Sequence, residues 1–428
     1  MLTGREQETA FLENHYKRTG SQILVVYGQR GVGKTALLTS FTEKKQTLRY
    51  SAGNCSSREQ QYLWGRELRS RGKEIAEYPS WRELLECMTI QKGETTADKK
   101  VLIIENFQYL LKGDTLFLQE LIRFLKEKKE ALLVILTTYA SGWVENSMIS
   151  KVGNLAFSVS GFLKVKELPF SAMRKIFSDY TVQESISLYA ALGGLPGLWR
   201  LLYPQNSAEE NLIRLLLQRN SFLPELMIKW LETAVYDTIL ATLADGRHGK
   251  LNDMYAHTGF SRAKISVYLK NLMELELVEK VLPGTYEICN AFVRFYFCFL
   301  FPHQTSERTE GSTFYEKYIR EEYNDFQLLT YRRICQEVLQ GRFRTVELWN
   351  SRQGKIYFLC REDTGRKIVV DYSGTVCYTS KDYDVLQASM KREHVTADSI
   401  LIFSENGYEK TLTEGTVQIL VHSVDENS

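Results

Sequence analysis

Eight consecutive residues near the start of the chain combine glycines with a lysine and a threonine at a spacing suited to phosphate chemistry. They are Gly28-Gln29-Arg30-Gly31-Val32-Gly33-Lys34-Thr35. Glycines let a backbone turn its N–H groups toward an anion. A lysine such as Lys34 can reach the β- and γ-phosphates of a nucleotide, and the hydroxyl of Thr35 can ligate Mg²⁺. The segment therefore predicts a binding loop for ATP and Mg²⁺.

The segments on either side of this loop give it the context that such chemistry needs. Residues 22–27 (QILVVY) are short, apolar and rich in β-branched side chains, which predicts a buried strand. Residues 36–41 (ALLTSF) carry apolar side chains at helical spacing. Strand, loop and helix together distinguish a P-loop from a glycine-rich turn that matches by chance. The helix N-terminus also favours a bound anion.

Two further apolar strands end in residues that could serve the same site. Residues 101–104 (VLII) lead into Glu105-Asn106, where the carboxylate could hold the Mg²⁺ shell and Asn106 could orient a water. Residues 132–136 lead into Thr137-Thr138. Thr137 could contact the γ-phosphate or the attacking water, or a threonine here could simply cap the strand end. The alternation predicts an α/β fold, a parallel sheet flanked by helices, with the ligand at the carboxyl ends of the strands.

The chain resembles the prokaryotic ATPases of the archaeal-type family, in the AAA/STAND branch of P-loop NTPases. The matching segments are Gly4-Arg5-Glu6, the glycine-rich loop, Phe107-Gln108-Tyr109-Leu110 and Gly193-Gly194-Leu195-Pro196. The resemblance is good over roughly residues 1–300 and weak beyond. It implies that Arg5 lies near the adenine, and that Pro196 begins a lid helix that reports on the nucleotide state. Pro196 is also an ordinary first residue of a helix.

One departure from the family pattern concerns hydrolysis. The family places an Asp-Glu pair after the second apolar strand, whereas this chain has Glu105-Asn106. An amide cannot accept a proton, so Asn106 cannot act as a general base. We therefore expect nucleotide binding with slow ATP hydrolysis, unless another acid substitutes.

The middle of the chain predicts a helical lid over residues 166–230 and a winged helix-turn-helix over 231–300. Helices are expected at 235–243, 251–258 and 261–275, the last capped by Ser261, and a hairpin at 278–288. Along the third helix, apolar side chains share one face: Ile265, Leu269, Leu272 and Leu275. Basic side chains on this helix (Arg262, Lys264 and Lys270) could contact DNA. Winged helices also serve as docking modules, and three cations are ordinary for a solvated face.

The last part, residues 301–428, predicts a domain like the PD-(D/E)XK nucleases that several family members carry. Helix is expected over much of 314–339, strands at 345–349, 355–360, 367–372, 375–378, 399–403 and 417–421, and a helix at 382–391. Nuclease chemistry needs two acids and a lysine around a metal. Here Asp371-Tyr372-Ser373 lacks the lysine, and Ile356–Leu359 provides no acid. We predict a degenerate domain that does not cleave DNA.

Composition limits the remaining classes of function. The 428 residues predict several domains, and a net charge of +2 does not indicate constitutive DNA binding. No apolar run is long enough to span a membrane, and the apolar segment 291–301 is interrupted by Arg294, which favours a buried helix. The N-terminus lacks a signal-peptide core, so a cytoplasmic protein is expected.

A nucleotide-dependent switch is the leading hypothesis. An ATP-dependent DNA-binding protein or nuclease, an ATP-sensing transcription regulator, a protein partner and a homo-oligomer stay open.

Overall fold

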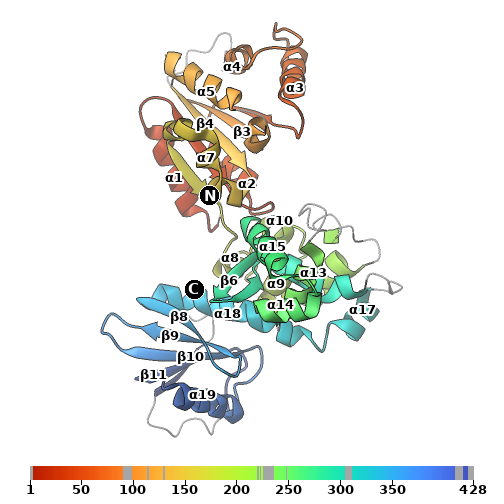
Figure 1. The fold of residues 1–428 in the computed structure, drawn as a ribbon, viewed down its shortest axis with the longest axis vertical. Helices are drawn as coiled ribbons and strands as arrows, with labels where there is room; N and C mark the ends of the chain where they lie inside the picture. The colour runs from red at the N-terminus through yellow and green to blue at the C-terminus, as the bar shows by residue number, and fades with distance from the viewer. Residues whose placement is uncertain are drawn as a thin grey trace. The chain divides into compact units, whose positions relative to one another are not determined.

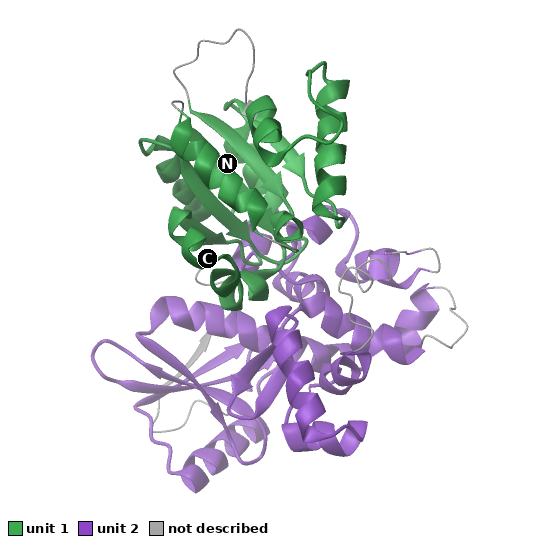
Figure 2. Cartoon of the chain, turned by 45° about the horizontal axis from the view of Figure 1, so that its top comes forward, with its two compact units in different colours: residues 1–167 green, residues 168–428 purple. Residues whose placement is uncertain are grey.

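The computed structural model describes residues 3–89, 99–112, 115–128, 131–218, 221, 223–224, 236–246, 248–303, 311–409 and 418–422. The chain divides into two compact units, Met1–Glu167 and Leu168–Ser428, here called the first and second units (Figure 2). The predicted boundary at residue 165 lies close to this division. The predicted boundaries at 230 and 300 fall within the second unit, where the finer division stays a prediction.

A parallel five-stranded sheet forms the centre of the first unit, as the sequence predicts for an α/β fold. Its strand order is β2-β3-β4-β1-β5, and every neighbouring pair is parallel. The carboxyl ends of all these strands therefore lie at one edge. The strands are β1 (Gln22–Tyr27), β2 (Thr47–Ser51), β3 (Lys100–Glu105), β4 (Leu132–Thr138) and β5 (Gly161–Lys164).

Helices cover both faces of this sheet (Figure 1). Strand residues such as Leu24, Val25 and Val26 are fully buried, because a parallel sheet is covered on both sides. The helices are α1 (Glu6–Lys17), α2 (Lys34–Thr42), α3 (Ser57–Ser70), α4 (Trp81–Thr89), α5 (Leu116–Glu127), α6 (Ser141–Asn146) and α7 (Met148–Val152). Short 3₁₀ segments η1 (Phe107–Leu111) and η2 (Gly153–Ser158) complete the unit.

The second unit begins with helices, in agreement with the helical prediction for 166–230 where residues are described. They are α8 (Phe170–Ile176), α9 (Val182–Leu192), α10 (Pro196–Trp199), α11 (Ala208–Leu212) and the π-helical η3 (Ile213–Leu217). Next come α13 (Asp237–Ala244), α14 (Leu251–Thr258), α15 (Arg262–Glu274) and the antiparallel hairpin β6 (Val278–Leu282) and β7 (Thr285–Ile288). The first residue of the helix predicted at 235–243 lies outside the described residues.

Helix α15 confirms most of its predicted pattern. Ser261 caps it, since its Oγ accepts the N–H of Lys264 at 3.3 Å. Ile265, Leu269 and Leu272 are buried, but the prediction for Leu275 is wrong, because that side chain is 46% exposed. The helix ends at Glu274, and Glu276 adopts a left-handed conformation that turns Leu277 into the core instead.

The apolar segment 291–301 is helical and buried, as expected. It forms α16 (Ala291–Phe295), the π-helical η5 (Tyr296–Leu300) and the start of the 3₁₀ segment η6 (Phe301–His303), and Arg294 is buried within it. The helical state expected over much of 314–339 is confirmed, and it is divided between α17 (Gly311–Tyr318) and α18 (Tyr323–Arg342). Among the described residues, no helix combines the length and apolar composition needed to cross a membrane.

A second five-stranded sheet, of order β12-β11-β10-β9-β8, follows α18. Its strands are β8 (Thr345–Asn350), β9 (Ile356–Arg361), β10 (Lys367–Gly374), β11 (Ser399–Ser404) and β12 (Gln418–His422), with α19 (Ser380–Glu393) between β10 and β11. The strand predicted at 375–378 is wrong. Gly374 has φ +70° and ends β10, so this segment forms a turn and only Tyr378 makes an isolated bridge, to Tyr408.

Candidate nucleotide-binding site

The glycine-rich loop leaves β1 and enters α2 at Lys34, in the predicted strand–loop–helix arrangement. Gly33 precedes the helix with φ 94°, a left-handed conformation that glycine adopts without strain. Gly28 begins the loop with φ +147°, and a Cβ there would lie 2.1 Å from the carbonyl oxygen of Val165. Only glycine therefore fits at position 28, because the loop starts in direct contact with the backbone that follows β5.

The Lys34 ammonium lies against the loop that the sequence assigns to phosphate. Its Nζ donates to the carbonyl oxygens of Gly28 at 2.6 Å and Gln29 at 2.8 Å. Contact of Lys34 with phosphate oxygens stays a prediction. The hydroxyl-bearing Thr35 is exposed, as are Arg30 and Gly31, whereas Val32 is buried.

Arg5 is built into the support of this loop. Its side chain is only 5% exposed, and its Nη2 donates to the carbonyl oxygens of both Val32 and Lys166 at 2.7 Å. Its Nη1 lies 2.7 Å from Glu8 Oε1. Because C=O and N–H point in opposite directions across a trans peptide, fixing the Val32 carbonyl also fixes the Gly33 N–H at the start of α2. Adenine contact by Arg5 stays a prediction, while support of the loop is a role that the sequence did not indicate.

Glu105 lies at the end of β3, at the same sheet edge as the loop. Strand order places β4 between β3 and β1, so Glu105 is one strand removed from the strand that carries the loop. Its Oε1 lies 3.3 Å from Nη1 of Arg49 on β2, a partner that sequence reasoning missed. Nothing in the sequence pattern indicates that β2 is the neighbour of β3, because strand order is set by the crossover connections.

The backbone conformation at residue 106 accounts for an asparagine at this position. Its backbone is left-handed, with φ 56° and ψ 39°, at the junction between β3 and η1. Asparagine tolerates this region better than most residues. Its Nδ2 donates to Ser51 Oγ at 3.3 Å. The amide therefore suits the turn, and its role at the general-base position stays a prediction.

The two threonines of β4 differ in their contacts. Thr137 and Thr138 pair with Val26 and Tyr27 of β1, which places them beside the start of the loop. Thr138 Oγ1 accepts the N–H of Ala140 at 3.0 Å. Thr138 therefore caps the end of the strand, which was the alternative to a role in the site. Thr137 is buried, and its contact with a γ-phosphate stays a prediction.

The donors at this edge suit Mg²⁺. A threonine hydroxyl and a carboxylate are hard oxygen ligands, and Mg²⁺ in phosphate sites keeps several waters and takes few protein ligands. Thr35 would hold the ion directly and Glu105 through water. The ion would supply charge neutralisation at the β- and γ-phosphates. The Glu105 carboxylate is also within reach of Arg49, which helps to orient it at the sheet edge.

Pro196 is the first residue of α10, as expected, and belongs to the second unit. The preceding glycines anchor the first residue of that unit: the N–H of Leu168 donates to the carbonyl of Gly194 at 2.8 Å. Tyr189 Oη donates to the Leu168 carbonyl, also at 2.8 Å. Both ends of the short connection between Lys166 and Leu168 are thus held, each within its own unit. A nucleotide contact by Pro196 stays a prediction.

The sheet formed by β8 to β12 holds a carboxylate that is fully engaged by protein groups. Asp371 is 0% exposed, and Lys355 Nζ lies 2.7 Å from its Oδ1. Tyr378 Oη and the Tyr372 N–H also donate to this carboxylate, at 2.7 Å each. Burial raises the pKa of Asp371, and the ammonium opposes that shift. Sequence reasoning noted a missing lysine after Asp371, but missed that Lys355 reaches the carboxylate from the start of the neighbouring strand.

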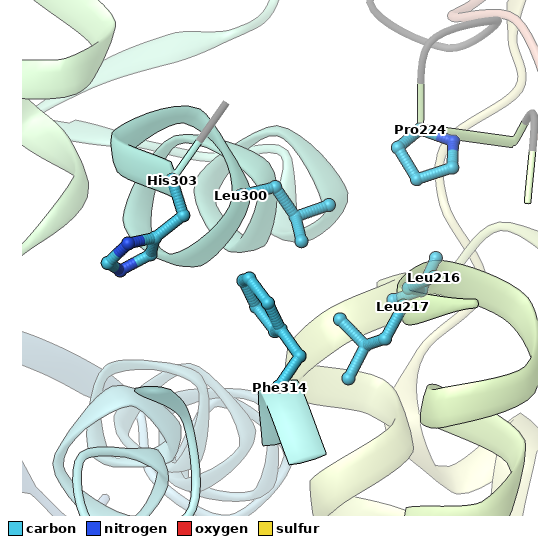
Figure 3. A pocket seen from close by; sticks show the side chains of 6 residues that line it. All are labelled: Leu216, Leu217, Pro224, Leu300, His303 and Phe314. Carbon is cyan, nitrogen blue, oxygen red and sulfur yellow. The ribbon is translucent and has the colours of Figure 1, made fainter. Parts of the chain in front are cut away.

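A small apolar pocket in the second unit is no candidate for a nucleotide. Its volume of about 20 Å³ leaves room for a single water. Figure 3 shows its lining, formed by Leu216, Leu217, Pro224, Leu300, His303 and Phe314.

Comparison with known proteins agrees with the geometry of the first unit. Residues 1–136 match the family described as AAA ATPase domain. An uncharacterized protein of Methanocaldococcus jannaschii is 23% identical over 401 residues, covering 86% of each chain. An uncharacterized ATP-binding protein of the same organism is 37% identical over 51 residues, 12% of this chain and 86% of that protein.

Among solved structures, a Walker-type ATPase of Pyrococcus abyssi aligns with a TM-score of 0.51 at 14% identity. The alignment covers 69% of this chain and 95% of that one. This likeness concerns the fold. The family match, together with the loop and the strand order, identifies the N-terminal part of the chain, residues 1–136, as an ATP-binding AAA ATPase domain.

Proposed function

We propose that the chain is a nucleotide-dependent switch, in which ATP at the P-loop changes the backbone that leads into the second unit. The observation that carries this proposal is the double contact of Arg5, whose Nη2 donates to the Val32 carbonyl in the loop and to the Lys166 carbonyl at the end of the first unit. One guanidinium thus joins the phosphate-binding backbone to the connection between the units.

Additional backbone contacts support the same coupling. The Val165 N–H donates to the Tyr27 carbonyl at 2.7 Å, and the Val165 carbonyl abuts Gly28. A change of the loop that moves Gly28 or Val32 therefore acts directly on residues 165–166. Lys34 is bonded to the Gly28 and Gln29 carbonyls, so its transfer to phosphate is one such change. Slow hydrolysis suits a switch, because it prolongs the ATP-bound state.

Hydrogen exchange of the full chain tests the switch. Amide exchange across residues 161–168 should differ between chains with Mg·ATP, with Mg·ADP and without nucleotide. The same comparison in Lys34→Ala should show no difference, because that variant lacks the phosphate contact. Unchanged exchange in this segment, under conditions in which calorimetry shows ATP bound to the wild type, would refute the coupling while leaving nucleotide binding intact.

A second candidate function is DNA binding by the helices and hairpin of residues 236–288. Exposed cations on α15 favour it, namely Arg262, Lys264 and Lys270. Other contacts weigh against it. Arg333 of α18 donates to the carbonyls of Ile288 and Cys289 at 2.9 and 3.0 Å. The end of the hairpin is therefore already bound by another helix of the same chain. Fluorescence anisotropy with labelled duplex at several salt concentrations decides this, since loss of phosphate contacts in Lys270→Ala should reduce the salt dependence.

A further inference from the structure

Arg30 of the glycine-rich loop places its guanidinium over an aromatic ring. Its guanidinium carbon lies 3.9 Å from the centroid of the Tyr139 ring. Tyr139 directly follows Thr138 at the end of β4, and Thr138 pairs with Tyr27 just before the loop. The ring therefore comes from the strand end that lies beside the P-loop.

The Tyr139 ring is itself fixed from the segment that follows β3. Its hydroxyl lies 2.5 Å from the hydroxyl of Tyr109, which belongs to η1. The two rings also meet edge to face, with centroids 6.5 Å apart. Three segments at the carboxyl edge of the sheet are thus joined by Arg30, Tyr139 and Tyr109.

Within the described part of the chain, the Arg30 guanidinium contacts a ring but forms no ion pair. The side chain is exposed, and no carboxylate of the described residues lies within ion-pair distance of it. A planar guanidinium that stacks on a ring keeps its N–H donors in the plane of the group, where they point outward from the stack. Arg30 can therefore rest on Tyr139 and still bond an anion at its edge.

We propose that Arg30 binds the terminal phosphate of ATP and thereby distinguishes ATP from ADP. This inference rests on the proposed function, in that the nucleotide occupies the P-loop. The loop already provides Lys34, which can reach the β- and γ-phosphates, and backbone N–H groups along the phosphate chain. A second cation on the same loop, held by the tyrosine that follows β4, meets the additional negative charge that only a triphosphate carries. Tyr139 is the positioning residue for this arginine.

The structure offers a matched control for the test. Arg58 of α3 is also exposed and lies over a tyrosine ring, 4.8 Å from the centroid of Tyr78. It is not part of the loop. Arg58→Gln therefore removes the same charge and the same type of ring contact from the same unit.

Calorimetry with Mg·ATP and Mg·ADP on the full chain tests the proposal. In Arg30→Gln, ATP affinity should fall roughly tenfold or more, as for a lost charge-assisted bond, while ADP affinity stays within about twofold. Tyr139→Leu should weaken ATP binding selectively but less, and Tyr139→Phe, which retains the ring, should keep it. Arg58→Gln should bind both nucleotides like the wild type.

Several outcomes would overturn the assignment. Equal losses for ATP and ADP in Arg30→Gln would make Arg30 a general support of the loop, and unchanged ATP affinity would remove it from the site. An Arg58→Gln variant with the same selective loss would show a distant charge effect instead of a contact. A wild-type chain that binds neither nucleotide would instead refute the proposed function itself.

Discussion

Replacement of Asn106 by aspartate is the most direct test of slow turnover. The proposed function assigns the slow step to the amide, which cannot take a proton from the attacking water. Asn106→Asp restores a carboxylate at the same position with no change in side-chain length. We expect binding of Mg·ATP to persist and hydrolysis to accelerate.

The expected size of the effect follows from the usual contribution of a general base, and the geometry at residue 106 determines whether the variant folds. General-base catalysis typically contributes about 10²–10⁴-fold, so a competent site should gain a rate in that range. The backbone at Asn106 is left-handed, with φ 56°, a region that costs most L-residues roughly 1–2 kcal/mol but that aspartate tolerates. The Ser51 hydroxyl, which accepts from the Asn106 amide at 3.3 Å, can donate to the new carboxylate instead. Asn106→Asp should therefore fold about as well as the wild type.

Glutamate at the same position is the matched comparison. It also provides a carboxylate, but it bears the left-handed strain, so Asn106→Glu should be the less stable of the two variants. Phosphate release under single-turnover conditions, with thermal unfolding in parallel, measures both effects. Brisk hydrolysis by the wild type, unchanged in Asn106→Asp, would show that Asn106 is not at the base position and would refute this reasoning.

Four further predictions concern other residues. Lys34→Ala should lose most of its affinity for ATP in calorimetry, since each charge-assisted bond to phosphate contributes about 1.5–3 kcal/mol, and unchanged affinity would contradict the P-loop assignment. Arg5→Gln should weaken ATP and ADP binding to a similar degree, because it disturbs the loop backbone and not one phosphate; a loss confined to ATP would speak against this. Arg332→Ala should cost about 3 kcal/mol in denaturant unfolding, because it removes the 2.5 Å partner of the buried Glu287 carboxylate and leaves only Arg333, 3.7 Å away, whereas Arg320→Ala, which breaks only exposed pairs with Glu209 and Glu316, should cost far less. Plasmid incubated with the protein, ATP and Mg²⁺ or Mn²⁺ should stay intact, because Asp371 is saturated by protein donors; cleavage that disappears in Asp371→Ala would overturn this.

The sequence by itself determined the phosphate-binding loop and the strands around it. Local rules suffice there, since the loop from Gly28 to Thr35 places its glycines, lysine and hydroxyl within one short segment. The strands at 22–27, 101–104 and 132–136 are continuous apolar runs, which a sheet covered on both faces requires. The cap at Ser261 and the hairpin after it are likewise local features, and the structure contains both.

Predictions failed where a single residue changes the direction of the backbone. Leu275 follows the helical spacing of α15, yet the helix stops one residue earlier and Glu276 turns Leu277 inward. The strand predicted at 375–378 is replaced by a turn because Gly374 adopts a left-handed conformation. Periodicity extends a pattern past such points, because it carries no information on where the chain leaves the regular conformation.

Only the tertiary structure decided which distant side chains share a site. Arg5 reaches Val32 and Lys166, and Lys355 reaches Asp371, through long-range packing that no spacing in the sequence encodes. Arg30 meets Tyr139 only because β4 lies beside β1 in the sheet. Motifs are local and can be found along the chain, whereas charge partners depend on strand order, which the crossover connections set. The sequence therefore determined where the glycine-rich loop lies, and the fold decided which residues support that loop and which cation we propose to meet the terminal phosphate.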